Sequence, residues 1–252
     1  MGPGHVNLLP GKRRFQRRRA ALVRFADVIG DRRILAIVPA RGGSQRLIAK
    51  NARPLAGRPM VAWTLEAASR SALIDHLVVS TDDPAVAATA TEMGWPPPFM
   101  RPDHLSGAAA SVIDAIEHAL DQVGGRWDYV VLLQPTSPLR TPADIDRAIR
   151  LCDETGAPSV IGVSPLPKPT AFYGQVSADG RYTPGGVDLE RTVVVNGAVY
   201  VGRPDVLMRD RTFQSEGALA YQMPFERSWD VDTPAEFAVC EALFPFQATY
   251  SG

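Results

Sequence analysis

Short apolar runs alternate with longer segments of helical periodicity from residue 34 onward, and no other feature constrains the fold as strongly. The apolar runs occupy 34–39, 77–80, 129–134 and 159–163. The helical patterns occupy 59–70, 83–93, 112–123 and 142–155. Strands joined through helices imply right-handed crossovers and a mostly parallel sheet covered on both faces. The sequence therefore predicts an α/β protein, a Rossmann-like three-layer αβα sandwich.

The second half of the chain departs from this alternation. Residues 165–192 are rich in proline, glycine and polar side chains, which predicts a loop-rich insertion over the active face that could include a hairpin. A long β run over 193–201, interrupted at Asn196-Gly197, a short strand at 221–225 and a helix over 233–243 follow. We expect one folded unit over 31–245, preceded by a basic extension over 1–30.

The charged residues are unevenly distributed. The whole chain has 27 Lys/Arg and 27 Asp/Glu, but residues 1–33 hold nine basic and two acidic residues, so the remainder carries 18 basic and 25 acidic residues. An acidic body argues against nucleic acid as a partner, although a bound divalent cation can still bring a nucleotide to it. The basic start of the chain predicts a solvated extension, with an anion-binding arm or an organellar presequence as alternatives.

Two absences in the sequence narrow the class of protein further. No apolar run approaches the ~18 residues of a membrane span, and no apolar segment of a secretory signal follows the basic start. The two cysteines, Cys152 and Cys240, lie far apart in helical patterns, which predicts buried thiols in a reducing compartment. We therefore expect a cytoplasmic protein with no membrane partner.

A glycine-containing loop follows the first apolar run, at the end of a strand where an α/β sheet binds its ligands. Gly42-Gly43-Ser44 allows backbone N–H groups to turn inward as an anion nest, and Arg41, Arg46 and Lys50 can add charge-assisted bonds to phosphate oxygens. The pattern matches neither a P-loop nor a dinucleotide fingerprint. A tight strand-to-helix turn with solvated basic side chains is the alternative.

Two other segments carry polar side chains suited to chemistry on a nucleotide. Asp230 and Asp232 alternate on an extended segment, so their carboxylates share a face and offer hard oxygen ligands to Mg²⁺; a helix-capping turn is the alternative. Gln134, Thr136, Ser137 and Arg140 follow a buried strand in a loop that two prolines fix. Such a loop can hold an acceptor against the α-phosphate, or form a rigid turn whose hydroxyls cap backbone groups.

The loop at 38–51 is the first of several segments that occur together in one known family. The others are Val79-Ser80-Thr81-Asp82-Asp83, Arg101-Pro102, Leu105-Ser106-Gly107, Leu133-Gln134-Pro135-Thr136-Ser137-Pro138-Leu139-Arg140, Asn196-Gly197-Ala198-Val199-Tyr200 and Asp230-Val231-Asp232-Thr233-Pro234. In this order they resemble the acylneuraminate cytidylyltransferase family, the CMP-sialic acid synthetases, over residues 34 to about 243. The resemblance implies a fold like that of the nucleotide-diphospho-sugar transferases.

The resemblance also implies the reaction and the residues of the site. CMP would pass from CTP to a small anionic acceptor with release of pyrophosphate, in a homodimer whose insertion reaches the partner's site. The nucleotide-binding residues would be Ala40, Arg41, Gly42, Gly43, Ser44, Lys50, Asn51, Arg101, Ala110 and Ser111. The acceptor would be bound by Gln134, Thr136, Ser137 and Asn196. Mg²⁺ would be bound by Asp230 and Asp232, and the catalytic residues would be Arg41, Lys50, Asp230 and Asp232.

The chain departs from the family pattern at several positions. In the first loop, Gln45 replaces a lysine and Ile48 a proline, and Ala108-Ala109 replace Asp-Thr ahead of Ser111. An arginine two residues before Asn196 is Val194 in this chain.

These departures concern the acceptor more than the nucleotide. Lys168 and Arg191 are the nearest cations left for an acceptor carboxylate. We expect a sialic-acid-like keto sugar acid as acceptor, with a small phosphonate of a natural-product pathway as the alternative. An Asp-x-Asp glycosyltransferase and a non-catalytic nucleotide-binding protein are further alternatives.

Overall fold

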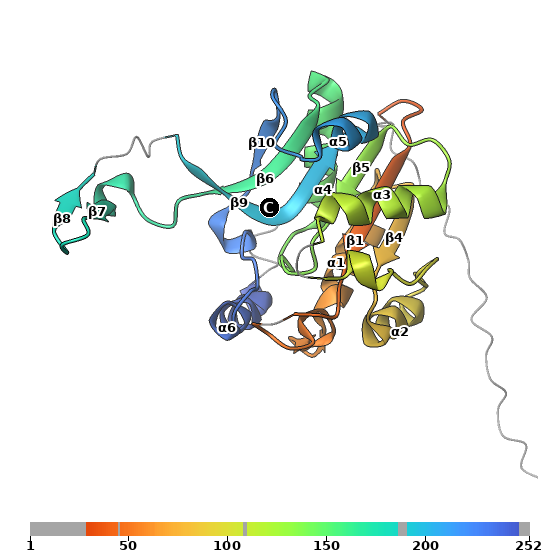
Figure 1. The fold of residues 1–252 in the computed structure, drawn as a ribbon, viewed down its shortest axis with the longest axis horizontal. Helices are drawn as coiled ribbons and strands as arrows, with labels where there is room; N and C mark the ends of the chain where they lie inside the picture. The colour runs from red at the N-terminus through yellow and green to blue at the C-terminus, as the bar shows by residue number, and fades with distance from the viewer. Residues whose placement is uncertain (1–28, 45, 108–109, 186–190, 247–252) are drawn as a thin grey trace, which may run out of the picture.

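A six-stranded sheet forms the centre of the computed structural model, which describes residues 29–44, 46–107, 110–185 and 191–246. The strand order is β10-β6-β9-β5-β1-β4 (Figure 1). The strands are β1 (Ile34–Pro39), β4 (His76–Ser80), β5 (Tyr129–Leu132), β6 (Ser159–Pro165), β9 (Val193–Gly202) and β10 (Leu219–Gln222). β1 is parallel to β4 and β5, and β10 to β6, whereas β9 is antiparallel to both of its neighbours. The predicted mostly parallel α/β sheet is confirmed.

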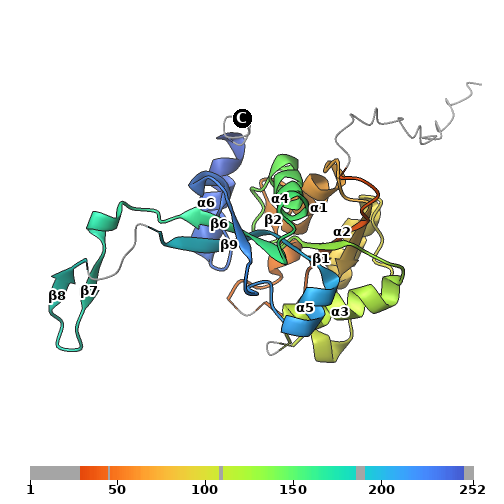
Figure 2. The same ribbon diagram turned by 90° about the horizontal axis from the view of Figure 1, so that it is seen from above.

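Helices cover both faces of this sheet, as the alternating sequence predicts (Figure 2). One face carries α1 (Met60–Ser69), α2 (Pro84–Glu92) and α4 (Pro142–Thr155). The other face carries α3 (Val112–Val123) and α5 (Pro204–Asp210). Successive strand side chains point to opposite faces, so Ile34, Ala36 and Val38 of β1 join the first core, and Leu35 and Ile37 join the second.

The helix boundaries follow local signals in the sequence. Ser111 caps α3 and Thr141 caps α4, each in a capping box with the aspartate three residues later, and both helices have the predicted bounds. Thr233 caps α6 (Pro234–Leu243) as predicted. The sequence does not predict α5, because its seven residues are too few to show a helical period.

Shorter elements shape the loops around the sheet. They are β2 (Pro54–Leu55) paired with β3 (Arg58–Pro59), β7 (Gly174–Val176) paired with β8 (Tyr182–Pro184), and the 3₁₀ turns η1 (Lys50–Ala52), η2 (Asp103–Leu105), η3 (Thr170–Phe172) and η4 (Phe225–Arg227). Cys152 in α4 and Cys240 in α6 are buried free thiols, as predicted. None of the helices that the structure describes has the length and apolar character to cross a membrane.

An arm leaves the body between β6 and β9; we use this name for residues 166–192, of which 186–190 lie outside the described residues. It carries the hairpin of β7 and β8, so the expectation of a hairpin in a loop-rich insertion is met. The hairpin projects away from the sheet (Figures 1 and 2), which corrects the expectation that the insertion lies over the active face. Phe172, Val176 and Tyr182 are exposed on it. The basic extension lies almost wholly in 1–28, outside the described residues.

Candidate active site

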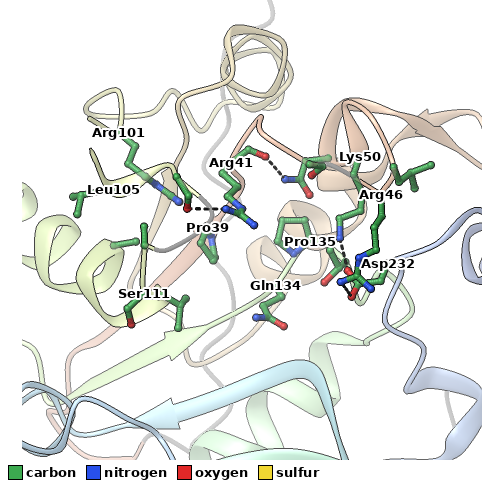
Figure 3. Close-up of a pocket in the computed structure, with 18 residues that line it drawn as sticks. Pro39, Arg41, Arg46, Lys50, Arg101, Leu105, Ser111, Gln134, Pro135 and Asp232 are labelled. Carbon is green, nitrogen blue, oxygen red and sulfur yellow. Dashed lines mark hydrogen bonds and ion pairs between the residues drawn. The ribbon is translucent and has the colours of Figure 1, made fainter. Parts of the chain in front are cut away.

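A cavity of about 400 Å³ opens at the carboxyl ends of β1 and β5 (Figure 3). This is the edge at which ligands bind in open α/β sheets. The lining residues come from the loop after β1, the segment before α3, the loop after β5 and the segment before α6: Pro39, Arg41, Ser44, Arg46, Leu47, Lys50, Asn51, Arg101, Leu105, Gly107, Ala110, Ser111, Val112, Ala115, Gln134, Pro135, Thr136 and Asp232. Four segments that are distant in sequence therefore meet here, as the strand order predicts.

Three cationic side chains from the loop after β1 face this cavity: Arg41, Arg46 and Lys50. Arg41 Nη1 donates to the carbonyl oxygen of Gly107 at 2.8 Å, which fixes the guanidinium across the cavity mouth. Asn51 is 5% exposed, and its Nδ2 donates to the Arg41 carbonyl oxygen at 2.9 Å. Asn51 Oδ1 is buried without a hydrogen-bond partner among the described residues, so it is available to a ligand donor.

The predicted anion nest is only partly present. The Gly42 N–H donates to Asp82 Oδ1 at 2.9 Å, and the Ser44 N–H donates to the Gly42 carbonyl oxygen at 2.8 Å. Both amides are engaged within the protein, so they do not form an anion nest in this structure. Ala40 is fully buried and Pro39 lines the cavity instead, so nucleotide binding by Ala40 stays a prediction.

Gly43 is not among the cavity-lining residues, although Ser44 beside it is. Ile48, which replaces the family's proline, is 79% exposed. The other departures in this half of the chain, Gln45 and Ala108-Ala109, lie outside the described residues.

Arg101 is a buried arginine, with 6% of its surface exposed, rather than a solvated one. Its Nε donates to Ser80 Oγ at 3.0 Å and its Nη2 to the Ser80 carbonyl oxygen, both at the end of β4. Burial lowers the pKa of Arg101, against the opposing charge of Asp82. The structure thus holds a positive charge at the cavity wall, as predicted.

Ser111 and Ala110 also line the cavity, as predicted. The Ser111 hydroxyl accepts the Ile113 N–H at 3.1 Å and so caps α3, while its O–H can still donate to a ligand. The start of α3 therefore faces the cavity, and its helix dipole adds partial positive charge there. We call Arg41, Arg46, Lys50, Arg101 and this helix start the nucleotide half of the cavity.

Asp232 borders this half through two ion pairs. Its Oδ1 lies 2.8 Å from Lys50 Nζ, and its Oδ2 lies 2.8 Å from Arg46 Nη2 (Figure 3). The hydrogen bond from Lys50 and the charges of both cations lower the pKa of Asp232. This carboxylate is therefore ionised and already close to the place where the loop cations would meet phosphate.

Asp230 lies deeper than Asp232 and is not a cavity-lining residue. Burial raises its pKa, and the charge of Asp232 raises it further, while a hydrogen bond with the Thr136 side chain lowers it. Val231 between them is fully buried, and its N–H donates to the Thr136 carbonyl oxygen at 2.7 Å. Because Val231 points into the core, Asp230 and Asp232 lie on the opposite side of this extended segment, and only Asp232 lines the cavity.

These carboxylates fit the donor set that Mg²⁺ needs. Asp230 Oδ1 is buried without a hydrogen-bond partner among the described residues, although the charge of Lys50 acts on this carboxylate, so the oxygen is available to a bound cation. The described residues contain no group of three or more His, Cys, Asp or Glu side chains suited to a metal. Mg²⁺ on a triphosphate needs only one or two protein carboxylates, because phosphate oxygens and water complete its shell.

Gln134, Pro135 and Thr136 line the opposite side of the cavity, which we call the acceptor half. Two other residues predicted here, Ser137 and Asn196, are buried away from it. Ser137 Oγ donates to the Asn196 carbonyl oxygen at 2.9 Å, and Asn196 Nδ2 donates to Ser228 Oγ at 3.0 Å. Their polar groups hold loops together in this structure, and acceptor binding by Ser137 and Asn196 stays a prediction.

The two cations predicted for the acceptor, Lys168 and Arg191, are exposed on the arm and do not line the cavity. The acceptor half of a single chain therefore has only uncharged lining residues from the loop after β5. The prediction that Lys168 and Arg191 bind the acceptor is therefore not met within a single chain, because the arm leads away from the body (Figure 1).

Two buried arginines hold segments beside this half in place: Arg140, which the sequence places in the same loop as Gln134, and Arg227, which the sequence does not predict. Arg140 is 2% exposed and donates to three elements: the Thr64 hydroxyl of α1 and the carbonyl oxygens of Gln134 and Ala198. Arg227 forms a buried ion pair with Asp144 at 2.8 Å. The position of Arg140, directly after a buried strand and a proline-fixed loop, is the sequence signal for its role. Nothing in the local sequence signals the burial of Arg227.

Known proteins resemble this chain over most of its length. Residues 35–176 match a family model described as Cytidylyltransferase. The chain is 34% identical over 223 residues to a CMP-N,N′-diacetyllegionaminic acid synthase of Legionella pneumophila, covering 84% of this chain and 96% of that protein. It is 32% identical to an N-acylneuraminate cytidylyltransferase of Escherichia coli, covering 81% of this chain, but spans only 50% of that longer relative. A pseudaminic acid cytidylyltransferase of Campylobacter jejuni is 26% identical, covering 83% of this chain and 95% of that protein.

Solved structures share the fold. A CMP-2-keto-3-deoxy-manno-octonic acid synthetase complexed with CTP aligns with a TM-score of 0.64 at 21% identity, covering 85% of this chain and 99% of that one. A 4-diphosphocytidyl-2C-methyl-D-erythritol synthase from Anaerococcus prevotii aligns with a TM-score of 0.62 at 11% identity, with the same coverage of both chains. At these identities the likeness concerns the arrangement of strands and helices.

Proposed function

This chain belongs to the cytidylyltransferase family and is a CTP-dependent nucleotidyltransferase, and we propose that its acceptor is a nine-carbon keto sugar acid of the legionaminic type. One observation carries the proposal: the cavity has clustered cations and an aspartate at one side and uncharged groups at the other. The chain that forms it also spans nearly all of a relative described as a CMP-N,N′-diacetyllegionaminic acid synthase. A cavity of this size accommodates the reacting ends of a nucleotide and an acceptor.

In the proposed reaction a hydroxyl oxygen of the acceptor bonds to the α-phosphorus of CTP. The bond from that phosphorus to the bridging oxygen breaks, pyrophosphate leaves and the hydroxyl proton is released. Arg41, Lys50 and Arg46 would bind the triphosphate and stabilise the charge that develops on it. Asp230 and Asp232 would hold Mg²⁺, which when bound neutralises charge on the triphosphate and on the leaving pyrophosphate.

Gln134 and Thr136 would orient the acceptor. Both face the cavity, and the loop that bears them is fixed by Arg140 and by the prolines at 135 and 138. A fixed position for the attacking oxygen lowers the entropy that must be lost in the transition state. The arm would supply the missing cation from a second copy of the chain, so we propose a homodimer. Exposed Phe172, Val176 and Tyr182 on the arm support an apolar contact with that copy.

A pyrophosphate-release assay tests the acceptor and the metal together. CTP and Mg²⁺ are incubated with N,N′-diacetyllegionaminic acid, N-acetylneuraminic acid, pseudaminic acid, Kdo or a small phosphonate, with UTP and GTP as nucleotide controls. We expect turnover with a nine-carbon acid and CTP, and its loss when EDTA removes the metal. Turnover with the phosphonate alone would contradict the acceptor assignment.

A further inference from the structure

Strand β9 departs from regular pairing beside the cavity. Val195 pairs with Val163 of β6 and Tyr200 pairs with Ile161, so β9 has four residues, 196–199, where β6 has only Gly162. The additional residues form a bulge in the middle of the sheet. Bulges beside active sites redirect side chains and backbone that regular pairing would fix elsewhere.

Gly162 and Asn196 hold this bulge in place. A Cβ atom at Gly162 would lie 2.8 Å from Asn196 Oδ1 and 2.9 Å from the Val199 carbonyl oxygen, so only glycine leaves room for the bulge. Asn196 Oδ1 accepts the Ala198 N–H at 3.1 Å within the bulge. Asn196 Nδ2 reaches Ser228, two residues before Asp230, so one buried amide joins β9 to the segment that carries the aspartates.

Side chains from two loops beside the acceptor half approach the bulge at Gly197. Its φ is +70°, a conformation that favours glycine. A Cβ atom there would lie 2.5 Å from Gln134 Oε1, 2.9 Å from Ser137 Oγ and 3.6 Å from Asp230 Cγ. The Gln134 amide and the Asp230 carboxylate thus approach the same bare α-carbon from two different loops.

We propose that Asn196 and Gly197 are positioning residues for the transfer reaction, because the bulge sets the place of the Gln134 amide relative to Asp230. This inference rests on the proposed function, in which Gln134 orients the acceptor. An added methyl group at position 197 would meet the far ends of the Gln134 and Ser137 side chains, with no backbone atom among its nearest neighbours. The fold can therefore accommodate the change by displacing Gln134, and the acceptor loses its position while the nucleotide half is untouched.

Gly197→Ala tests this with two matched controls. Gly202→Ala lies in the same strand and places its Cβ 2.9 Å from Leu207 Cδ2 in the core, remote from the cavity. Gly156→Ala has a similar φ of +66° with nothing within 4 Å of the added atom, so it isolates backbone strain. Each variant is assayed for pyrophosphate release with CTP, Mg²⁺ and N,N′-diacetyllegionaminic or N-acetylneuraminic acid, for CTP binding by calorimetry, and for Tm.

We expect Gly197→Ala to lower kcat/KM for the acceptor on the order of 100-fold, as a displacement of about 1 Å in a reacting group can do, while the CTP Kd changes less than about threefold. Both controls should lower Tm and keep kcat/KM. Three outcomes would each overturn this inference while leaving the proposed function standing. They are unchanged acceptor kinetics in Gly197→Ala, an equal loss of kcat/KM in either control, and a parallel loss of CTP binding in Gly197→Ala. A wild-type protein that binds CTP but releases no pyrophosphate with any acceptor would overturn the proposed function and the inference with it.

Discussion

Cationic side chains line the nucleotide half of the cavity, whereas the lining residues of the acceptor half, Gln134, Pro135 and Thr136, are uncharged. The nucleotide half is also assembled largely from two neighbouring strand ends, whose loops are held by hydrogen bonds such as Arg41 to Gly107 and Arg101 to Ser80. The acceptor half depends on a bulged antiparallel strand and on two buried arginines. The difference teaches that the local sequence reveals the cations of the nucleotide half, whereas it does not reveal the tertiary contacts that support the acceptor half.

Asp230 lies where the two halves meet, and its substitution should have the largest effect. Asp230→Asn keeps the shape and a hydrogen-bonding group for Thr136 but removes the charge opposite Lys50 and the hard oxygen that remains unpaired. We expect kcat to fall on the order of 1,000-fold, because the variant weakens binding of the Mg²⁺ that would stabilise the negative charge of the transition state. Initial rates of pyrophosphate release over a Mg²⁺ titration measure this.

Asp205→Asn serves as the control for that substitution, since Asp205 pairs with Arg203 at the surface. Its kcat should stay near that of wild type. If Asp230→Asn keeps kcat within about tenfold of wild type while the control behaves as expected, the carboxylate is structural and the cavity has no catalytic centre between its halves.

Asp144→Asn should produce the largest loss of stability, because it removes the negative charge opposite the buried guanidinium of Arg227. Asp144 is fully buried, and removing one member of a buried pair costs about 3–5 kcal/mol. Burial by itself raises the pKa of Asp144, but hydrogen bonds from Arg227 and Thr141 outweigh it and leave the pKa below its usual value. Urea unfolding of wild type and variant at several pH values measures the difference.

The sign of the pH dependence follows from that depressed pKa. The ionised carboxylate stabilises the folded state at every pH above the unfolded pKa of about 3.9, and this contribution is lost as the pH falls through the lower folded value. The stability gap between wild type and Asp144→Asn should therefore be constant through neutral pH and close only below about pH 4. A gap that closes near neutrality would show that another group is responsible.

The difference between the two halves of the cavity is also the difference between what the sequence predicts and what it does not. The bounds of α3 and α4 follow from the capping boxes begun by Ser111 and Thr141, which are local signals. The loop cations and Asp232 are predicted because they follow strand ends directly or align with a family motif. In contrast, the placement of β9 between β5 and β6, and the burial of Asn196 in its bulge, depend on Gly162, more than thirty residues earlier.

Arg41→Gln and Gln134→Ala should separate the halves kinetically. Loss of the Arg41 charge should raise the KM for CTP roughly 10- to 100-fold, the equivalent of one charge-assisted hydrogen bond, with the acceptor KM nearly unchanged. Gln134→Ala should raise the acceptor KM by a smaller factor and leave CTP binding as it is, because a neutral hydrogen bond is weaker. Steady-state kinetics with each substrate varied in turn measure both. Equal effects of both variants on both substrates would show that the two halves act as one site.

The smallest effect on catalysis is expected from the arm, which in the proposed homodimer would reach the acceptor half of a second copy of the chain. Phe172 is 75% exposed on the arm, so Phe172→Asp should not disturb the body but should oppose burial of this surface in a dimer. We expect light scattering to show a lower mass for Phe172→Asp than for wild type. We expect kcat/KM for the acceptor to fall about tenfold, because one ion pair to the acceptor would be lost, while CTP binding stays intact. Phe172→Leu keeps an apolar side chain and should retain both the mass and the activity. A variant that loses mass but keeps full acceptor kinetics would show that the acceptor half is complete within one chain, and that the difference between the halves lies in charge alone.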